Sequence, residues 1–303
     1  MLIELAQKEF LAEKKFEGLT QNSITGYVTL FTTWNEWLVT QNIGQVEELS
    51  PRVIKQYLTF CLEENNNRPR TINSKLKSLR AFARWLHEEQ ITNEMFTKGV
   101  KTMKQDDSPK MVKDSDIQQA LRHLRRIKRR EDSFNARRNY TLLLHLIGTG
   151  MRLSEVERLN WDDIDFKDYL ITINQSKSRK SQSVPLSETL ATELLEWRLY
   201  LENHFGQVPI PVFVTRKNTR LTKNGIQLFF KRIKKTLGIE THFSAHTMRN
   251  VYIKSLLKNG ANLREVQLLA RHSKIEVTRQ YIGYFAHELK ETMDKANPLR
   301  GLL

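Results

Sequence analysis

The sequence predicts a mainly α-helical protein with a small β-hairpin in its second half, arranged as two domains. Three observations support this fold class. Proline and glycine are scarce, at 7 and 12 of 303 residues. Apolar residues recur at the 3.6-residue spacing of helices that bury one face. A short polar stretch near residue 105 lacks this periodicity and contains a proline, so it divides the chain into two parts of ordinary domain size.

Residues 1–104 are predicted to form a helical domain. Ser50 and Pro51 mark the start of its third helix, because serine caps a helix N-terminus and proline fits the first turn. The fourth helix places apolar side chains, including Leu76 and Trp85, along one face. The expected helices are Ile3–Lys15, Asn22–Gln41, Arg52–Glu64 and Thr71–Glu89.

A basic face lies opposite the apolar face of that fourth helix. Residues 67–84 contain six basic side chains and no acidic one. Such a face is commonly just solvated, but in the context of the whole chain we expect it to contact a DNA backbone. The six residues are Arg68, Arg70, Lys75, Lys77, Arg80 and Arg84.

Residues 105–113 are predicted to be a linker, and residues 114–303 a second domain. This domain should contain helices on either side of one hairpin, since Tyr169–Asn174 alternates like a strand and Ser183–Leu186 returns after a polar turn. The expected helices are Ser115–Arg129, Asn139–Ile147, Leu153–Leu159, Ser187–Asn203, Asn224–Leu237, Ala245–Leu257, Leu263–Ala270, Val277–Tyr284 and His287–Ala296.

The charge of the chain points to a polyanionic partner. It has 49 basic and 34 acidic residues, a net charge of +15. Only 14 of the basic and 12 of the acidic residues lie in the first 104 positions, so +13 of the excess falls in the remainder. Nucleic acid is the natural ligand of such a surface, although solvated lysine and arginine side chains are the simpler alternative.

Cysteine content and hydropathy indicate the compartment. The single cysteine, Cys61, excludes an internal disulfide and is expected to be a small core residue. No apolar run approaches the roughly 18 residues of a membrane span. The first fifteen residues include acidic side chains within their apolar stretch, which is not typical of a signal peptide. We therefore expect a soluble cytoplasmic protein.

Two arginines, two histidines and a tyrosine form a set that can transfer a phosphoryl group onto a tyrosine hydroxyl. Arg152 and Arg249 can clamp a phosphate from two sides, because the guanidinium fork makes bidentate contacts and stays charged. His246, on the same helix face as Arg249, and His272 are candidates for the base and a phosphate donor. Tyr281 is the candidate nucleophile, and it needs such help because a phenol is protonated at neutral pH.

Three further residues have supporting roles in this hypothesis. Glu155 follows Arg152 by three positions and can orient it, although an ordinary helical pair would show the same spacing. The leaving 5′ oxygen needs an acid, and either Lys177 or Lys180 near the hairpin tip could supply it. Taken singly, each of these residues could be a solvated or core side chain. Their joint occurrence in one order favours the catalytic interpretation.

Asp162, Asp163 and Asp165 form an acidic cluster that resembles a magnesium site at first inspection. We interpret the cluster as a solvated turn between a helix and a strand. Arginines supply the positive charge that a metal ion would otherwise provide. The chain also lacks a phosphate-binding GxxxxGK[ST] loop. The sequence therefore predicts no metal and no cofactor.

The order of these motifs resembles that of the tyrosine recombinases, or phage integrase family. Gly148–Glu155 (GTGMRLSE) is similar to the first family box, and His246–Arg249 to its H-x-x-R box. Leu269–His272 and Thr278–Tyr281 resemble L-L-G-H and T-x-x-Y, and their spacing selects Tyr281 over Tyr284. The hairpin is similar to G-K-G-x-K-x-R-x-V-P-L, and that register selects Lys177 as the catalytic lysine. Arg179 and Lys180 are further candidate DNA contacts.

The sequence departs from the family pattern at several positions. Ser176, Ser178 and Gln182 replace two hairpin glycines and an arginine, and Asn250 stands where histidine is common. Arg271 replaces the glycine before His272. This last change affects the turn that places His272, and it suggests an added phosphate contact. None of the departures removes a catalytic functional group.

The resemblance implies a specific reaction. Tyr281 would attack the scissile phosphate, leaving a 3′-phosphotyrosine and a free 5′-hydroxyl, without metal or ATP. Arg152, Arg249, His246 and His272 would stabilise the transition state. The partner would be double-stranded DNA with specific recombination sites.

The resemblance also implies an assembly. The expected state is a homo-tetramer acting through a Holliday junction, with residues 287–303 docked on a neighbouring subunit. An own-domain helix is the alternative for that segment. The absence of an extra N-terminal arm-binding domain favours a compact, Xer-like recombinase or a transposon or phage integrase.

Two other functions are compatible with the same residues. A type IB topoisomerase shares the chemistry but religates the strand that it cut. A regulator without catalytic activity could use the same scaffold to bind DNA, although the presence of all six catalytic groups argues against it.

Overall fold

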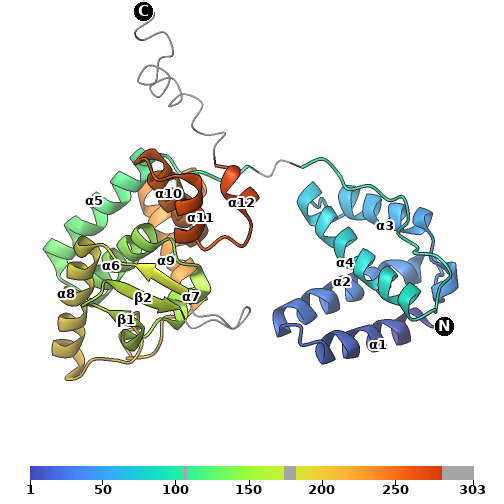
Figure 1. Ribbon diagram of the computed structural model, residues 1–303, viewed down its shortest axis with the longest axis horizontal. Helices are drawn as coiled ribbons and strands as arrows, with labels where there is room; N and C mark the ends of the chain where they lie inside the picture. The colour runs from blue at the N-terminus through green and yellow to red at the C-terminus, as the bar shows by residue number, and fades with distance from the viewer. Residues whose placement is uncertain (106–107, 174–181, 282–303) are drawn as a thin grey trace, which may run out of the picture. The chain divides into compact units, whose positions relative to one another are not determined.

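The computed structural model describes residues 1–105, 108–173 and 182–281. The chain divides into two compact units, Met1–Asp106 and Asp107–Leu303 (Figure 1). The described residues are mainly helical, and the second unit adds a three-stranded antiparallel sheet. The predicted fold class is therefore confirmed. Within the described ranges, no helix is both long and apolar enough to cross a membrane.

The first unit consists of four α-helices and one short 3₁₀ turn, Val46–Glu48. Each α-helix agrees with its predicted range within a few residues. Ser50 caps the third helix as expected, because its Oγ accepts a hydrogen bond from the backbone N–H of Val53 at 3.4 Å. The helices are α1 (Ile3–Phe16), α2 (Gln21–Thr40), α3 (Pro51–Glu63) and α4 (Pro69–Glu88).

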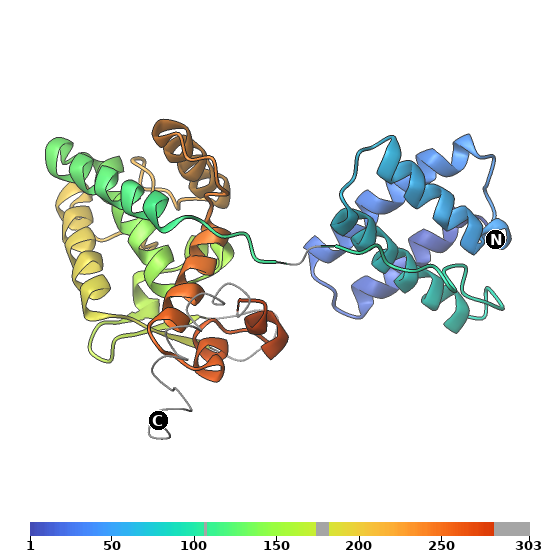
Figure 2. The ribbon, with the colours of Figure 1, turned by 90° about the horizontal axis from the view of Figure 1, so that it is seen from above.

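The helices of this unit pack against one another (Figure 2), and aromatic side chains fill the core between them. The Phe82 ring on α4 lies edge-on to Phe10 of α1, with centroids 5.4 Å apart, and to Trp34 of α2 at 6.3 Å. All three are fully buried. Cys61 is also fully buried, in agreement with its predicted role as a core residue.

The predicted basic face of α4 is divided between bonded and exposed side chains. Lys75 donates to the hydroxyl of Tyr57 at 3.2 Å, and Arg80 donates to the carbonyl of Val100. These two side chains are half-buried and contribute to the packing of their own unit. The other four are exposed: Arg68, Arg70, Lys77 and Arg84.

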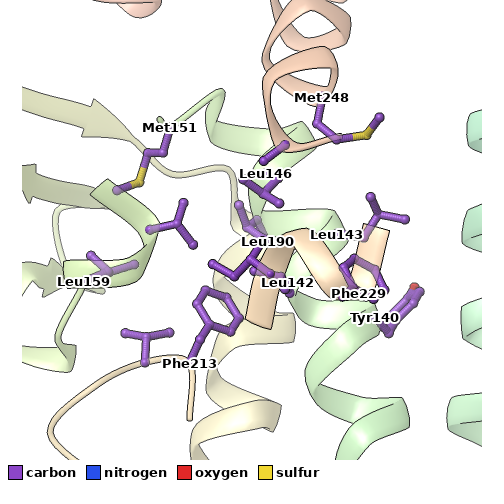
Figure 3. Close-up of a cluster of buried hydrophobic side chains, with 14 of the residues drawn as sticks. Tyr140, Leu142, Leu143, Leu146, Met151, Leu159, Leu190, Phe213, Phe229 and Met248 are labelled. Atoms are coloured by element: carbon purple, nitrogen blue, oxygen red, sulfur yellow. The ribbon is translucent and has the colours of Figure 1, made fainter. Parts of the chain in front are cut away.

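Helix α6 (Phe134–Thr149) forms the centre of the second unit. It packs against α5 (Asp114–Glu131), α8 (Glu188–Phe205) and α10 (Ala245–Lys258). Leu142, Leu143 and Leu146 on α6 are fully buried among side chains from these helices (Figure 3). The helix begins earlier than the predicted Asn139, because Ser133 caps it by accepting from Ala136 N at 3.4 Å.

The predicted hairpin is present and belongs to a sheet of order β1-β2-β3. Strand β2 (Leu170–Ile173) pairs with β3 (Gln182–Pro185), with Ile171 opposite Val184. Strand β1 (Ile164–Asp165) was not predicted, since two residues are too few for a period to be recognised. Ile171 and Val184 are fully buried, so the inner face of the hairpin packs on the core around α6.

The other α-helices among the described residues of the second unit are α7 (Leu153–Arg158), α9 (Lys223–Leu237), α11 (Leu263–Leu269) and α12 (Ile275–Arg279). The predicted helix Val277–Tyr284 is shifted, because α12 begins at Ile275 and ends at Arg279. Tyr281 therefore lies in a turn two residues beyond α12. Tyr284 and the predicted helix His287–Ala296 lie outside the described residues.

Gly150 ends α6 and allows it to lie close to α10. Its φ of +56° is in the left-handed region, and an added Cβ would fall 2.3 Å from Cδ1 of Tyr252 on α10. Any other residue would meet both backbone strain and this ring. Arg152 follows two residues later, so this close approach determines where Arg152 sits relative to α10.

We predict that Gly150→Ala lowers the free energy of unfolding by about 2–5 kcal/mol, because left-handed strain and overpacking against Tyr252 add together. Gly238→Ala is the matched control. Gly238 has a φ of +62° but no atom within 4 Å of an added Cβ. It should therefore lose only about 1–2 kcal/mol. Urea denaturation followed by circular dichroism measures both, and equal losses would contradict the proposed role of Tyr252.

Candidate active site

Arg152 lies at the N-terminus of α7 with its side chain fixed at two points. Its Nη1 donates to Oε1 of Glu155 at 2.8 Å, and its Nη2 donates to the backbone carbonyl of Arg271 at 3.0 Å. Its own backbone N–H donates to Oε2 of Glu155 at 2.7 Å. The Arg152 side chain remains 45% exposed, so its guanidinium is oriented yet accessible to a ligand.

Glu155 is a buried carboxylate between two arginines. Arg271 donates from Nη2 to Oε2 of Glu155 at 2.7 Å, and the Arg271 side chain is 2% exposed. Burial raises the pKa of Glu155, but the charge of Arg271 and the hydrogen bonds from Arg152 outweigh burial and bring the pKa below its usual range. Glu155 is therefore ionised at neutral pH, as an orienting group for Arg152 must be.

Arg249 is buried in α10 and connects three segments. Its Nη1 donates to the carbonyl of Gly150 at 2.6 Å, and its Nη2 donates to the carbonyl of Ala270. Burial, followed by repulsion from Arg152 and Arg271, lowers the pKa of Arg249 to about 10. The guanidinium is still charged at neutral pH. Its position depends on the end of α6 and on the turn that follows α11.

Arg152, His246 and Arg249 line one hollow of about 590 Å³. His246 occupies the first turn of α10, three residues before Arg249, as the sequence spacing predicts. The structure thus brings together three of the predicted site residues from segments about a hundred positions apart. The other lining residues are Met151, Leu153, Gln227, Phe230, Lys231, Lys234, Phe243, Ser244 and Ala245.

Lys231 and Lys234 of α9 were missed by sequence reasoning as site residues. They project into the same hollow as the two arginines. With Gln227 they have the i, i+4, i+7 spacing of one helix face, which is the signal that could have identified them. Both lysines add positive charge to the lining of the hollow, and Nζ of Lys234 also donates to the carbonyl of Glu240 at 3.2 Å.

His272 lies after α11 and has a neutral imidazole. Its Nδ1 is 2.9 Å from Oγ1 of Thr278, and its backbone N–H donates to the carbonyl of Gln267 at 3.0 Å. Burial, followed by the charges of Arg249, Arg152 and Arg271, lowers the pKa of His272 to about 4. A neutral histidine can donate one hydrogen bond without adding charge to the site.

The turn before His272 forms although arginine replaces glycine there. Arg271 has a φ of +54°, the left-handed conformation that glycine adopts at lower cost. Its side chain turns inward to Glu155 and is buried, so it does not serve as the added phosphate contact that we expected. It instead takes part in the support of Arg152.

Tyr281 is buried, and its hydroxyl donates to Oδ1 of Asn250 at 2.9 Å. Asn250 in turn donates from Nδ2 to the carbonyl of Lys110 at 2.9 Å. The ring packs in a small cluster that includes Tyr252 and Val266. An amide is not a base, and the phenol oxygen is covered. Attack on a ligand therefore requires the hydroxyl to leave Asn250.

The remaining predicted residues are the basic side chains of the hairpin and the acidic cluster that precedes it. Lys177, Arg179 and Lys180 lie outside the described residues. Asp163 and Asp165 accept backbone hydrogen bonds, from Asn160 at 2.9 Å in the first case, as expected of a turn. Among the residues that the structure describes, no group of three or more His, Cys, Asp or Glu side chains is arranged to hold a metal ion.

The titration of His272 provides a test of this electrostatic environment. We expect its imidazole signals to stay constant from pH 8 to pH 5 and to titrate with a midpoint near the pKa of about 4. Nuclear magnetic resonance measures this, and His272→Gln assigns the signals. The pKa in the unfolded chain is 6.5, so the unfolded state binds more protons between these values. The lowered pKa therefore reduces the free energy of unfolding as the pH falls from 6.5 to about 4. A midpoint above 6 would contradict the assignment.

The bond between Tyr281 and Asn250 predicts the accessibility of the phenol. Asn250→Leu should increase the nitration rate of Tyr281 about five-fold, because one hydrogen bond contributes roughly 1 kcal/mol. Peptide mass spectrometry after tetranitromethane treatment measures this rate. Tyr57, fully buried in the first unit, is the internal control and should not respond. Unchanged nitration of Tyr281 would show that Asn250 does not hold it.

Comparisons with known proteins place the chain in a family. The Phage integrase family matches residues 110–288, and the Phage integrase, N-terminal SAM-like domain matches residues 8–90. The chain is 28% identical over 302 residues to tyrosine recombinase XerC of Bacillus pumilus, covering 98% of this chain and 96% of that protein. It is also 28% identical over 294 residues to tyrosine recombinase XerD of Listeria innocua, covering 93% and 94%.

Solved structures share the fold at lower sequence identity. The Tn1549 transposon integrase in complex with a circular intermediate DNA has a TM-score of 0.75 and 17% identity, covering 91% of this chain and 94% of that one. The XerH site-specific recombinase bound to a palindromic difH substrate has a TM-score of 0.75 and 19% identity, covering 92% and 81%. Since the family match alone spans more than half of the sequence, this chain belongs to the phage integrase family.

Proposed function

We propose that the protein is a site-specific DNA recombinase that cuts and rejoins strands through a 3′-phosphotyrosine. The observation that carries this proposal is that Arg152, Arg249 and His246 line one hollow. The hydroxyl of Tyr281 is hydrogen-bonded to Asn250, which neighbours Arg249 on the same helix. Relatives named tyrosine recombinases match almost the whole chain, which supports the same reaction.

The charges of the site suit phosphoryl transfer. A phosphodiester gains negative charge on its equatorial oxygens as the nucleophile approaches. Arg152 and Arg249 are assigned as donors to those oxygens, because a guanidinium offers several N–H groups and carries positive charge. His246 and neutral His272 are assigned to further donation or to proton removal from Tyr281. Lys177 is assigned to the leaving 5′ oxygen, as the family resemblance implies.

Tyr281 is assigned as the nucleophile, although its hydroxyl is held by Asn250 in this structure. Its turn lies directly after α12, a helix of five residues, Ile275–Arg279. Release of one hydrogen bond is a small cost compared with the barrier to phosphodiester cleavage. We infer that binding of DNA draws the phenol toward the arginines.

The partner in this proposal is double-stranded DNA with specific recombination sites. The net charge of +15, together with Lys231 and Lys234 beside the arginines, supports phosphate binding. The exposed basic residues of α4 are assigned to backbone contacts made by the first unit. We also propose a homo-tetramer on DNA, a Holliday-junction intermediate and a cytoplasmic location.

The chemistry assigned here needs neither metal nor ATP, because arginines carry the charge and the phosphotyrosine conserves the bond energy. The two alternative functions are less well supported. The similar proteins are named recombinases and integrases, which does not favour a type IB topoisomerase or a regulator.

Replacement of Tyr281 tests the nucleophile. We expect Tyr281→Phe to abolish covalent attachment to DNA while binding persists within about three-fold, because only the phenol oxygen is lost. The substrate is a nicked suicide duplex chosen by tight binding from the DNA that flanks the gene. Attachment is measured on denaturing gels, with EDTA present throughout.

Tyr169→Phe is the matched control, since Tyr169 is an exposed residue next to the hairpin and should attach at the wild-type rate. Covalent attachment by the Tyr281→Phe protein would refute the assignment. Loss of wild-type attachment in EDTA would instead favour a metal-dependent reaction.

A further inference from the structure

Arg271 is an unexpected residue at its position. The turn before His272 requires a left-handed backbone, with a φ of +54°, and arginine adopts this conformation less readily than the glycine of the family pattern. The sequence thus accepts local strain in order to place a guanidinium here. What that guanidinium contacts indicates its role.

The Arg271 side chain is buried against Glu155. Its Nη2 lies 2.7 Å from Oε2 of Glu155, and the two side chains are 2% and 3% exposed. Its Nε has no hydrogen-bond partner among the described groups. A side chain so enclosed cannot reach a DNA phosphate. Its effect on the site must pass through the residues that it contacts.

Two of those contacts lead to Arg152. The carboxylate of Glu155 accepts from Nη1 of Arg152 at 2.8 Å, and the backbone carbonyl of Arg271 accepts from its Nη2 at 3.0 Å. Arg271 therefore supports Arg152 from both sides, once through Glu155 and once through its own main chain. Fixing Glu155 fixes the direction in which the Arg152 guanidinium points.

The charges lead to a second consequence. Glu155 alone would balance the charge of Arg152 and leave a pair with no net charge facing the phosphate. With Arg271 added, two guanidinium groups share one carboxylate, and the cluster keeps a net charge of +1. The field of a buried charge extends to its neighbours, because the low polarity of the interior screens it weakly. The charge of Arg271 lowers the pKa of both Arg249 and His272.

We propose that Arg271 is a positioning residue of the candidate active site. It orients Arg152 through Glu155 and restores the positive charge that Glu155 would cancel. This inference rests on the proposed function. It assigns a role to a residue that contacts neither the phosphate nor the nucleophile. Its effect should appear in the chemical step rather than in DNA affinity.

Three substitutions separate charge from shape. Arg271→Met removes the charge and keeps the length of the side chain. Arg271→Lys keeps the charge but loses the fork, and Arg271→Gly also removes the backbone strain. Arg264→Met is the matched control, because Arg264 is an exposed arginine on nearby α11 that donates to Gln267 and not to Glu155.

The readout is the single-turnover rate of covalent attachment to a nicked suicide duplex, measured beside noncovalent affinity. We expect Arg271→Met and Arg271→Gly to lower this rate about 10–100-fold, as loss of an outer supporting group commonly does. Their dissociation constants should stay within about three-fold. Arg271→Lys should recover to within about ten-fold of the wild-type rate, because it restores the charge.

A neutral methylphosphonate at the scissile position provides the second readout. If Arg271 acts through charge, the defect of Arg271→Met should shrink to less than about three-fold on this substrate, since less negative charge develops there. A defect of equal size on both substrates would overturn the charge role. Should Arg271→Met fail to fold, the Arg271→Gly protein compared on the two substrates tests the same point, because it also lacks the charge.

The outcomes distinguish this inference from the function on which it rests. If the wild-type protein forms no covalent complex, the proposed function and this inference fall together. If the wild-type protein and Arg264→Met attach at full rate and Arg271→Met does so too, the inference alone is overturned.

Discussion

The guanidinium groups of Arg152, Arg249 and Arg271 repel one another, and the second unit holds them together with one carboxylate and four backbone carbonyls, the fourth being that of Leu269. Glu155 neutralises one of the three charges. The carbonyls of Gly150 and Ala270 accept from Arg249, and the carbonyl of Arg271 accepts from Arg152. These carbonyls come from two segments that are far apart in sequence. Positive charge that would disperse in an unfolded chain is thereby concentrated at one hollow, where an anion can compensate it.

The hydrophobic core sets the positions of these charges. Met151 and Met248, the immediate neighbours of Arg152 and Arg249, are both fully buried in the cluster around α6 (Figure 3). Each arginine therefore extends from a backbone anchored by an apolar side chain. Gly150 allows the end of α6 to meet α10, and this meeting lets Arg249 bind the Gly150 carbonyl. The packing of the second unit and the geometry of the candidate active site thus depend on the same junction.

Local signals were sufficient for most of the fold. The cap of α3 and the apolar periods of α2, α3 and α4 depend on residues within one or two turns, so the ranges of these helices agree closely with prediction. Errors arose where tertiary contacts decide the boundary. Helix α6 begins five residues earlier than predicted, because burial of Phe134 stabilises a turn that looks polar in sequence. Strand β1 depends on pairing with β2, which no local pattern shows.

The sequence by itself determined the chemical groups of the site, because their types and order are written in short motifs. Only the tertiary structure decided how those groups are used. It turned Arg271 inward to Glu155, lowered the pKa of His272 and held the Tyr281 hydroxyl on Asn250. It also added Lys231 and Lys234 to the hollow. The pKa and the exposure of a side chain depend on its burial and on contacts with segments far apart in the chain. The spacing of residues along one segment does not reveal those contacts.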